Sequence, residues 1–256
     1  MPRKPVEKTI PAGIFLQHIS REIYRGDPLY FGKDVINRFD DPAGVFGVLY
    51  LVYDLPTGLM ESVFHGHQWH RARSQRSISR SELEFRMVRV VKINHDLNLC
   101  DLASPGAAVK GFGQNAAQLS TRRYTGTQAL SATIAQRLGS NEQPYDGILY
   151  PSRNNPGSVC IGLFDGAAAK VSIAEDIRLD DHRDWPSFKH EFSITVVTSK
   201  RSSRRRHRPG KRPQGVTLQF ALRRKHLADS HRVDIVVVLS PRRATARTSP
   251  LEEPTR

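Results

Sequence analysis

The stretch INRFDDPAGVFGVLYLVYDLPTGLMESVFH, residues 36–65, decides how the surrounding chain folds. Within it, residues 40–44 (DDPAG) have the composition of a turn. The continuous apolar run of residues 48–53 (VLYLVY) predicts a buried strand. Asp54 can then cap a helix over residues 55–66, with Pro56 in the first turn, where its missing N–H costs nothing. A turn, a buried strand and a helix are therefore expected in direct succession.

Arg38 and Glu61 flank the predicted strand and are the chemical groups of interest in this stretch. Arg38 precedes the turn, whereas Glu61 lies on the helix, beside the apolar stripe that contains Leu59 and Val63. Taken alone, the position of Glu61 favours an exposed helix carboxylate. In a second interpretation both residues face one ligand, the arginine holding an anion and the carboxylate facing a developing cation. The local pattern leaves both interpretations open.

Other segments give further expectations for secondary structure. Residues 14–24 carry apolar residues at roughly the spacing of a helix. Arg25 follows this segment directly, a position that favours a solvated charge. Residues 84–93 (EFRMVRVVKI) alternate apolar with basic residues, which predicts a half-exposed strand. Residues 128–138 predict a helix. Short apolar runs predict strands at residues 147–150, 158–164 and 171–177.

Ser152 lies in a polar turn, residues 151–157 (PSRNNPG), between two of these predicted strands. A serine at the C-terminal end of a strand, in a loop rich in hydrogen-bond donors, suits ligand binding. An ordinary hairpin serine fits the same spacing equally well. A hydrolase nucleophile does not fit, because the serine is not part of a GxSxG motif.

The net charge of +14 is concentrated at the C-terminus. Residues 1–198 hold 23 Lys and Arg against 21 Asp and Glu, whereas residues 199–256 hold 16 against 4. We expect a loose arm over residues 1–13, a globular domain over residues 14–198, and a poorly ordered basic extension over residues 199–256. The extension is open to three interpretations: an arm for nucleic acid or an acidic partner, a solvated segment, or a frame-altered end.

Two groups of possible metal ligands have simpler explanations. Arginines close by in the sequence would repel a cation from the histidines at residues 65, 67 and 70. Cys100 and Cys160 are far apart and are expected to be buried thiols. The sequence has no apolar run long enough to span a membrane and no signal-peptide pattern at its start, so we expect a cytoplasmic protein without a metal.

The motifs around five residues resemble the RES-domain family, which is named for its Arg, Glu and Ser: Arg25, Arg38, Tyr50, Glu61 and Ser152. The matching pieces are IYRG, NRFDDPAGVFGVLYLVYD, LMESVFH, TQALSATI, DGILYPSR and IGLFD. They occur in the order of the family and cover residues 15–180. The family usually has Trp, and often Asn, where this chain has Phe39 and Asp40, a mild departure from the family's pattern. The basic extension lies outside the family's pattern.

The resemblance implies an α+β fold similar to ADP-ribosyltransferases, with a mixed β core and flanking helices. It also implies an enzyme that uses NAD+ as a substrate and needs no cofactor, cleaving the nicotinamide–ribose bond with phosphate as acceptor to give ADP-ribose-1''-phosphate. Family members include bacterial toxins, so a helix-turn-helix antitoxin is the implied partner. Two alternatives remain open: transfer of ADP-ribose to a protein, and non-enzymatic nucleic-acid binding through the basic extension.

The resemblance also implies a role for each matching residue. Arg25 and Arg38 would grip the pyrophosphate of NAD+ with always-charged, bidentate guanidinium forks. Glu61 would stabilise the positive charge that develops on the ribose as nicotinamide departs. Tyr50 would stack against nicotinamide or donate a hydrogen bond to it. Ser152 would orient either the ribose or Glu61.

Overall fold

The computed structural model describes residues 4–65 and 76–198 of the chain, so the basic extension, His67 and His70 lie outside the described residues. The strands are β1 (Val6–Ile10), β2 (Phe15–Arg21), β3 (Val48–Val52), β4 (Ser77–Ser79), β5 (Arg86–Ile93), β6 (Leu97–Asp101), β7 (Gly147–Pro151), β8 (Val159–Phe164), β9 (Val171–Arg178) and β10 (Thr195–Val197). The helices are α1 (Leu55–Glu61), α2 (Arg80–Glu84), α3 (Ala107–Phe112), α4 (Ala116–Leu119), α5 (Thr125–Ala135) and α6 (Trp185–Glu191). Short 3-10 segments are η1 (Glu22–Tyr24), η3 (Asp165–Lys170) and η4 (Leu179–Asp181).

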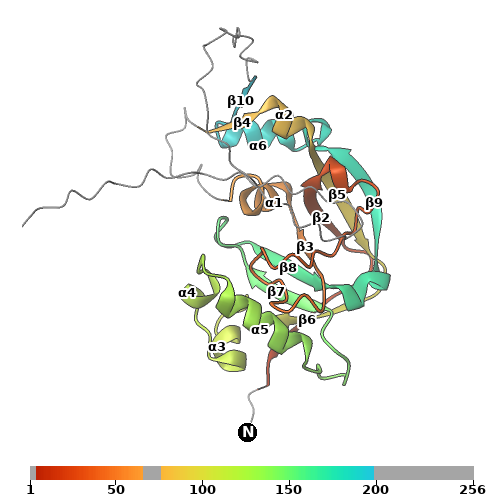
Figure 1. Cartoon of the computed structure of the whole chain (residues 1–256), viewed down its shortest axis with the longest axis vertical. Helices are drawn as coiled ribbons and strands as arrows, with labels where there is room; N and C mark the ends of the chain where they lie inside the picture. Colours follow the sequence, from red (N-terminus) through yellow and green to blue (C-terminus); the bar gives the residue numbers. More distant parts are fainter. Residues whose placement is uncertain (1–3, 66–75, 199–256) are drawn as a thin grey trace, which may run out of the picture. The chain divides into compact units, whose positions relative to one another are not determined.

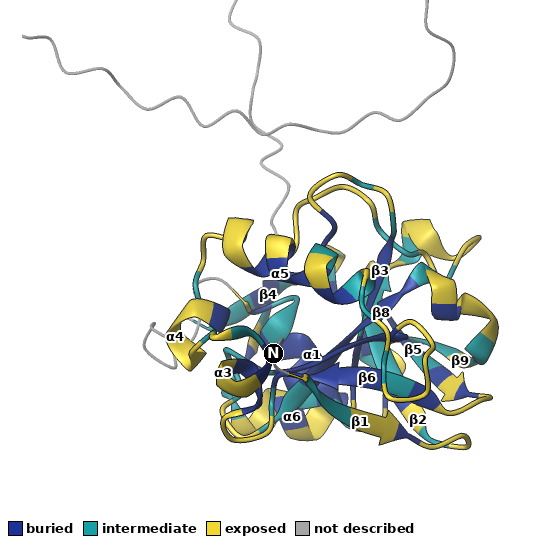
Figure 2. Ribbon diagram, turned by 90° about the horizontal axis from the view of Figure 1, so that it is seen from below, coloured by how far each residue is buried: buried dark blue, intermediate teal, exposed yellow. Residues whose placement is uncertain are grey.

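The fold is α+β, with a mixed sheet and flanking helices, as expected. Eight strands form one sheet in the order β1-β6-β7-β8-β3-β2-β5-β9, in which β6 and β7 run parallel and the other neighbours antiparallel. Helices α3, α4 and α5 gather beside β6, β7 and β8, whereas α2, α6 and the small β4–β10 sheet lie near the other end (Figure 1). Buried residues concentrate in the strands at the centre of the sheet (Figure 2).

Strand β3 is buried on both faces, which explains its unbroken apolar sequence. Val48 and Val52 belong to the core cluster that includes Leu130 and Ile134 of α5. The intervening Leu49 and Leu51 point to the opposite face and join a second cluster. A strand covered on both faces reads as a continuous hydrophobic run rather than an alternating one. The predicted buried strand at residues 48–53 is therefore confirmed over Val48–Val52, whereas Tyr53 follows the strand and is exposed.

The sheet divides between β2 and β3. These strands are paired at one position, Gln17 with Val52, whereas β2 pairs with β5 along its whole length. Helix α1 packs across the division at Gly58, where an added Cβ would lie 2.8 Å from Ile19 Cγ1 and 3.0 Å from Val52 Cγ2. A residue without a side chain thus lets the helix approach both strands closely.

Three sequence-based predictions were wrong. Residues 1–13 are not a loose arm throughout, because β1 pairs with β6 and buries Ile10. Residues 14–24 form β2 and η1 rather than a helix, because β2 lies inside the sheet and buries apolar residues on both faces, so its apolar positions do not alternate. The strand at residues 84–93 begins at Arg86 and is not half-exposed: Arg89 is fully buried, 3.3 Å from Asp176.

Helix α1 begins as the sequence predicts and ends earlier. The Asp54 side chain accepts a hydrogen bond from the backbone N–H of Thr57 at 2.7 Å, and Pro56 occupies the first turn. The helix ends at Glu61 instead of residue 66, with Ser62 as its C-cap. Glu61 is thereby placed at the final position of the helix.

An Asp54→Ala variant is expected to lose about 1 kcal/mol of unfolding free energy, because it removes the N-cap hydrogen bond. Urea denaturation followed by circular dichroism would measure the loss. Asp184→Ala is the matched control, since Asp184 is the N-cap of α6 but makes no capping bond through its side chain. The control should change stability by about 0.5 kcal/mol or less. Equal losses in the two variants would contradict a capping role for Asp54.

Candidate active site

A cleft with a volume of about 660 Å³ lies where β2 and β3 part. Side chains from distant parts of the sequence line it, because strands, the end of α1 and the segment between β2 and β3 all meet there. Six of the lining residues carry the arguments that follow: Arg21, Arg38, Tyr50, Glu61, Arg86 and Tyr150. The cleft thus unites Arg38, Tyr50 and Glu61 of the five residues that the sequence singles out.

Glu61 is held by the turn that follows β7. Its Oε1 atom accepts hydrogen bonds from Ser152 Oγ at 2.6 Å and from the backbone N–H groups of Arg153 and Asn154 at 2.7 and 2.8 Å. All three bonds reach Oε1, so within the described part of the chain Oε2 is available for a ligand. Three donors on one oxygen fix the orientation of the carboxylate rigidly.

Ser152 is buried and contacts Glu61 directly. It donates to the carboxylate and accepts the backbone N–H of Asn155 at 2.9 Å, so its hydroxyl is occupied on both sides. The Asn155 amide also reaches Thr57 Oγ1 of α1 at 2.8 Å, a second link between the turn and the helix. Of the two roles that the resemblance implied for Ser152, orientation of Glu61 has direct geometric support.

Arg38 is buried and lies against the aromatic ring of Tyr150. Its guanidinium carbon is 4.4 Å from the centre of that ring, and Nη2 donates a hydrogen bond to the carbonyl oxygen of Pro151 at 3.1 Å. Stacking and this bond orient the guanidinium in the cleft, where a guanidinium can donate further hydrogen bonds to an anion. Phe39 is fully buried against Tyr150, so it belongs to the core rather than to a stacking surface in the cleft.

Asp40 fixes the loop that carries Arg38. Its carboxylate accepts the backbone N–H groups of Ile36 and Asn37 at 3.0 and 2.7 Å and the Tyr50 hydroxyl at 2.8 Å. The same hydroxyl accepts the N–H of Phe39. Burial and Asp40 hold the pKa of Tyr50 well above its usual value, so the phenol stays protonated. The Tyr50 ring lines the cleft, while its hydroxyl already has partners within the protein.

Helix α5 also anchors the loop that carries Arg38, a role that the spacing of residues in the sequence did not indicate. Gln128 Nε2 donates to the carbonyl oxygens of Val35 and Asn37 at 3.2 and 3.0 Å, and Ser131 Oγ donates to that of Phe39 at 2.7 Å. Both residues belong to the motif TQALSATI, one of the pieces that resemble the family. That motif was the available signal for their importance.

Arg25 lies outside the set of described residues that line the cleft. Its side chain is 58% exposed and lies 3.4 Å from Asp176 and 3.8 Å from Glu22. The structure therefore does not place Arg25 with Arg38 and Glu61. Arg21 and Arg86, which sequence reasoning did not single out, line the cleft instead.

His18 of β2 also lines the cleft and was missed. Its Nδ1 lies 2.9 Å from the carbonyl oxygen of Tyr50, and because a carbonyl can only accept, Nδ1 carries the proton in this contact. Burial, together with the positive charge of Arg89, lowers the pKa of His18 to about 4. The ring is therefore neutral at neutral pH and bridges the two strands where they part.

The cysteines are free, buried thiols, as predicted. Burial raises the pKa of both Cys100 and Cys160 to about 12, which makes a thiolate nucleophile unavailable. Among residues 4–65 and 76–198, no three His, Cys, Asp or Glu side chains gather as a metal site. The same residues include no helix with the length and apolarity needed to cross a membrane.

Fold and cleft together define an α+β protein whose divided sheet carries an arginine and a serine-anchored glutamate in one cleft. The family model described as RES domain matches residues 16–186, more than half of the sequence, so the chain belongs to the RES-domain family. The resemblance seen in the sequence motifs is thereby confirmed. No curated protein matches the chain.

Proposed function

We propose that the chain is an NAD+-consuming enzyme that cleaves the bond between nicotinamide and ribose, with phosphate as the acceptor. The observation that carries this proposal is the anchoring of Glu61: three donors hold Oε1, and Oε2 is left for a ligand in a cleft that also holds Arg38. Membership of the RES-domain family supports the choice of NAD+ as substrate. The reaction needs neither a metal nor a cofactor.

In the proposed reaction a phosphate oxygen forms a bond to C1 of the nicotinamide ribose while the C–N bond to nicotinamide breaks. The electron pair of that bond moves to the positively charged ring nitrogen, so nicotinamide leaves as a neutral molecule. The products are nicotinamide and ADP-ribose-1''-phosphate. Positive charge develops on the ribose before the new bond is complete, and the Glu61 carboxylate stabilises it electrostatically.

Arg38 holds the pyrophosphate of NAD+ in this proposal. A buried guanidinium that is already oriented by Tyr150 and Pro151 loses little conformational freedom when it binds a phosphate group. Ser152 keeps Glu61 in position, and the ring of Tyr50 forms part of the wall against which nicotinamide lies. Arg25 requires a rotation away from Asp176 to contribute to the pyrophosphate site.

The wider assignment follows the family. The divided mixed sheet supports the expected similarity to ADP-ribosyltransferases, with a catalytic domain that extends the expected residues 14–198 to include β1. We propose that the protein acts in the cytoplasm as a toxin and that a helix-turn-helix antitoxin blocks its cleft. The RES-domain match supports these roles at the level of the family.

Purified full-length protein, freed of any antitoxin, is expected to release nicotinamide from NAD+ in the presence of phosphate. Chromatography would quantify nicotinamide, and NAD+ labelled in its adenylate part would identify the acceptor. Label in ADP-ribose-1''-phosphate supports phosphorolysis, whereas label on protein supports ADP-ribosyl transfer. If a correctly folded sample releases no nicotinamide, the proposed function is wrong.

A further inference from the structure

Two arginines face each other across neighbouring strands at one end of the cleft. Arg21, at the end of β2, is paired in register with Arg86, at the start of β5, and both line the cleft. Like charges placed directly opposite each other on neighbouring strands destabilise a sheet. The two facing arginines are therefore unfavourable for the stability of the sheet unless negatively charged groups pair with them.

Among the described residues, one of the two charges, that of Arg86, has a carboxylate partner. Arg86 is bonded through Nε, at 2.7 Å, and through Nη2 to the Glu82 carboxylate of α2, and its side chain is 15% exposed. Arg21 is exposed and forms no ion pair within residues 4–65 and 76–198. One uncompensated positive charge thus remains in the cleft beside an oriented guanidinium.

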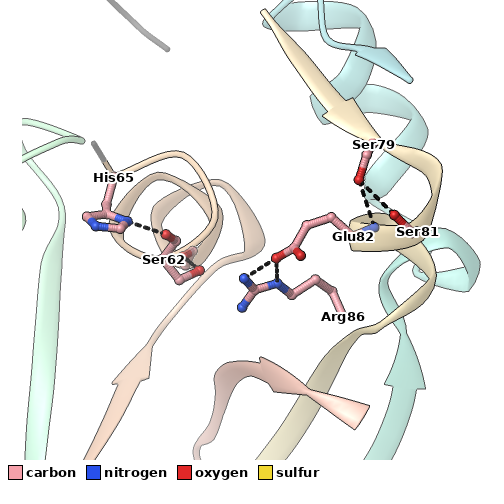
Figure 3. A network of polar contacts seen from close by, with 7 residues as sticks. Ser62, His65, Ser79, Ser81, Glu82 and Arg86 are labelled. Carbon is pink, nitrogen blue, oxygen red and sulfur yellow. Dashed lines mark hydrogen bonds and ion pairs between the residues drawn. The ribbon is translucent and has the colours of Figure 1, made fainter. Parts of the chain in front are cut away.

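The pair lies on the side of the sheet that carries α1. Ile19, two residues before Arg21 and so on the same face of β2, meets α1 at Gly58. Figure 3 shows Arg86 reaching from β5 toward the end of α1, where Ser62 and His65 lie, while Glu82 meets it from α2. Ser62 and His65 line the same cleft, and Ser62 directly follows Glu61.

We propose that Arg21 and Arg86 form a second anion subsite of the cleft, which takes a phosphate group. Guanidinium groups bind phosphate oxygens through short, charge-assisted, often bidentate hydrogen bonds. The role of this subsite in catalysis rests on the proposed function: the phosphate is either the free acceptor or the pyrophosphate of NAD+. Arg38 is then one of two places in the cleft where phosphate binds.

Isothermal titration calorimetry at constant ionic strength tests the subsite with two probes, inorganic phosphate and ADP-ribose, and does not depend on turnover. Arg21→Gln is expected to lower the affinity of the protein for one of the two probes by about ten-fold or more, because the substitution removes charge-assisted hydrogen bonds. Loss of phosphate binding assigns the subsite to the acceptor, and loss of ADP-ribose binding assigns it to the dinucleotide. Arg86→Gln should lower the affinity for the same probe.

Arg183→Gln is the matched control, because Arg183 is 89% exposed and lies outside the residues that line the cleft. If Arg21→Gln binds both probes as this control does, or if the unmodified protein binds neither, the subsite does not exist. Wild-type protein that binds a probe through Arg21 but leaves NAD+ intact would overturn the proposed function alone. Normal NAD+ turnover with no effect of Arg21→Gln on either probe would overturn the subsite alone.

Discussion

A Glu61→Gln variant is expected to consume NAD+ with a kcat about 10²–10³-fold below that of the unmodified protein. Glutamine keeps an oxygen that can accept the three hydrogen bonds from the 152–154 turn, so the turn should stay in place. What disappears is the negative charge opposite the developing cation on the ribose. Initial rates of nicotinamide release at saturating NAD+ would measure the loss, and thermal denaturation would show whether the fold is retained.

Two comparisons make this prediction specific. Glu191→Gln removes the same charge from an exposed position at the end of α6 and should leave kcat unchanged. Glu61→Ala removes the hydrogen-bond acceptor as well as the charge, leaving Ser152 and two backbone N–H groups without their partner, so it should also lower the unfolding temperature. Turnover by Glu61→Gln at the rate of the Glu191→Gln control would show that the Glu61 charge has no part in the reaction.

Local sequence patterns predict the elements whose environment is uniform along their length. The run of residues 48–53 and the cap at Asp54 are recognisable because β3 is buried on both faces and the cap is a contact within one turn. Local patterns fail for β2, whose residues range from exposed Phe15 to buried Leu16 within one strand, and for β1, whose strand pairing depends on β6. Such environments come from pairing across the sheet, which no short window of sequence contains.

The resemblance predicted Arg38, Tyr50 and Glu61 for the site and offered Glu61 as a partner of Ser152, but it also included Arg25, which lies outside the cleft. Glu61 and Ser152 are 91 positions apart, and their hydrogen bond depends on how α1 and β7 pack around the divided sheet. The local pattern favours an exposed carboxylate for Glu61, and the family resemblance reverses that preference. The structure adds the contact with the 152–154 turn. Arg21 and Arg86 carry no motif at all, because their proximity is produced by strand register.

An Arg38→Lys variant is expected to raise the KM for NAD+ by about 10- to 100-fold, with a smaller change in kcat. Lysine keeps the positive charge but loses the planar fork and the stacking on Tyr150. A hydrogen bond to a charged group is worth about 1.5–3 kcal/mol, and about 1.4 kcal/mol corresponds to a ten-fold change in binding. Steady-state kinetics over a range of NAD+ concentrations would separate KM from kcat.

Arg137→Lys is the matched control for this prediction. Arg137 also stacks on an aromatic ring, 4.9 Å from the centre of Phe112, but it lies in a separate hollow between α3 and α5. The control therefore loses the same fork and a similar cation–π contact at a position away from Glu61. If Arg38→Lys and Arg137→Lys have the same KM for NAD+, Arg38 does not bind the dinucleotide. A selective effect at Arg38 would instead support binding of the pyrophosphate beside Tyr150, in the cleft that Glu61 also lines.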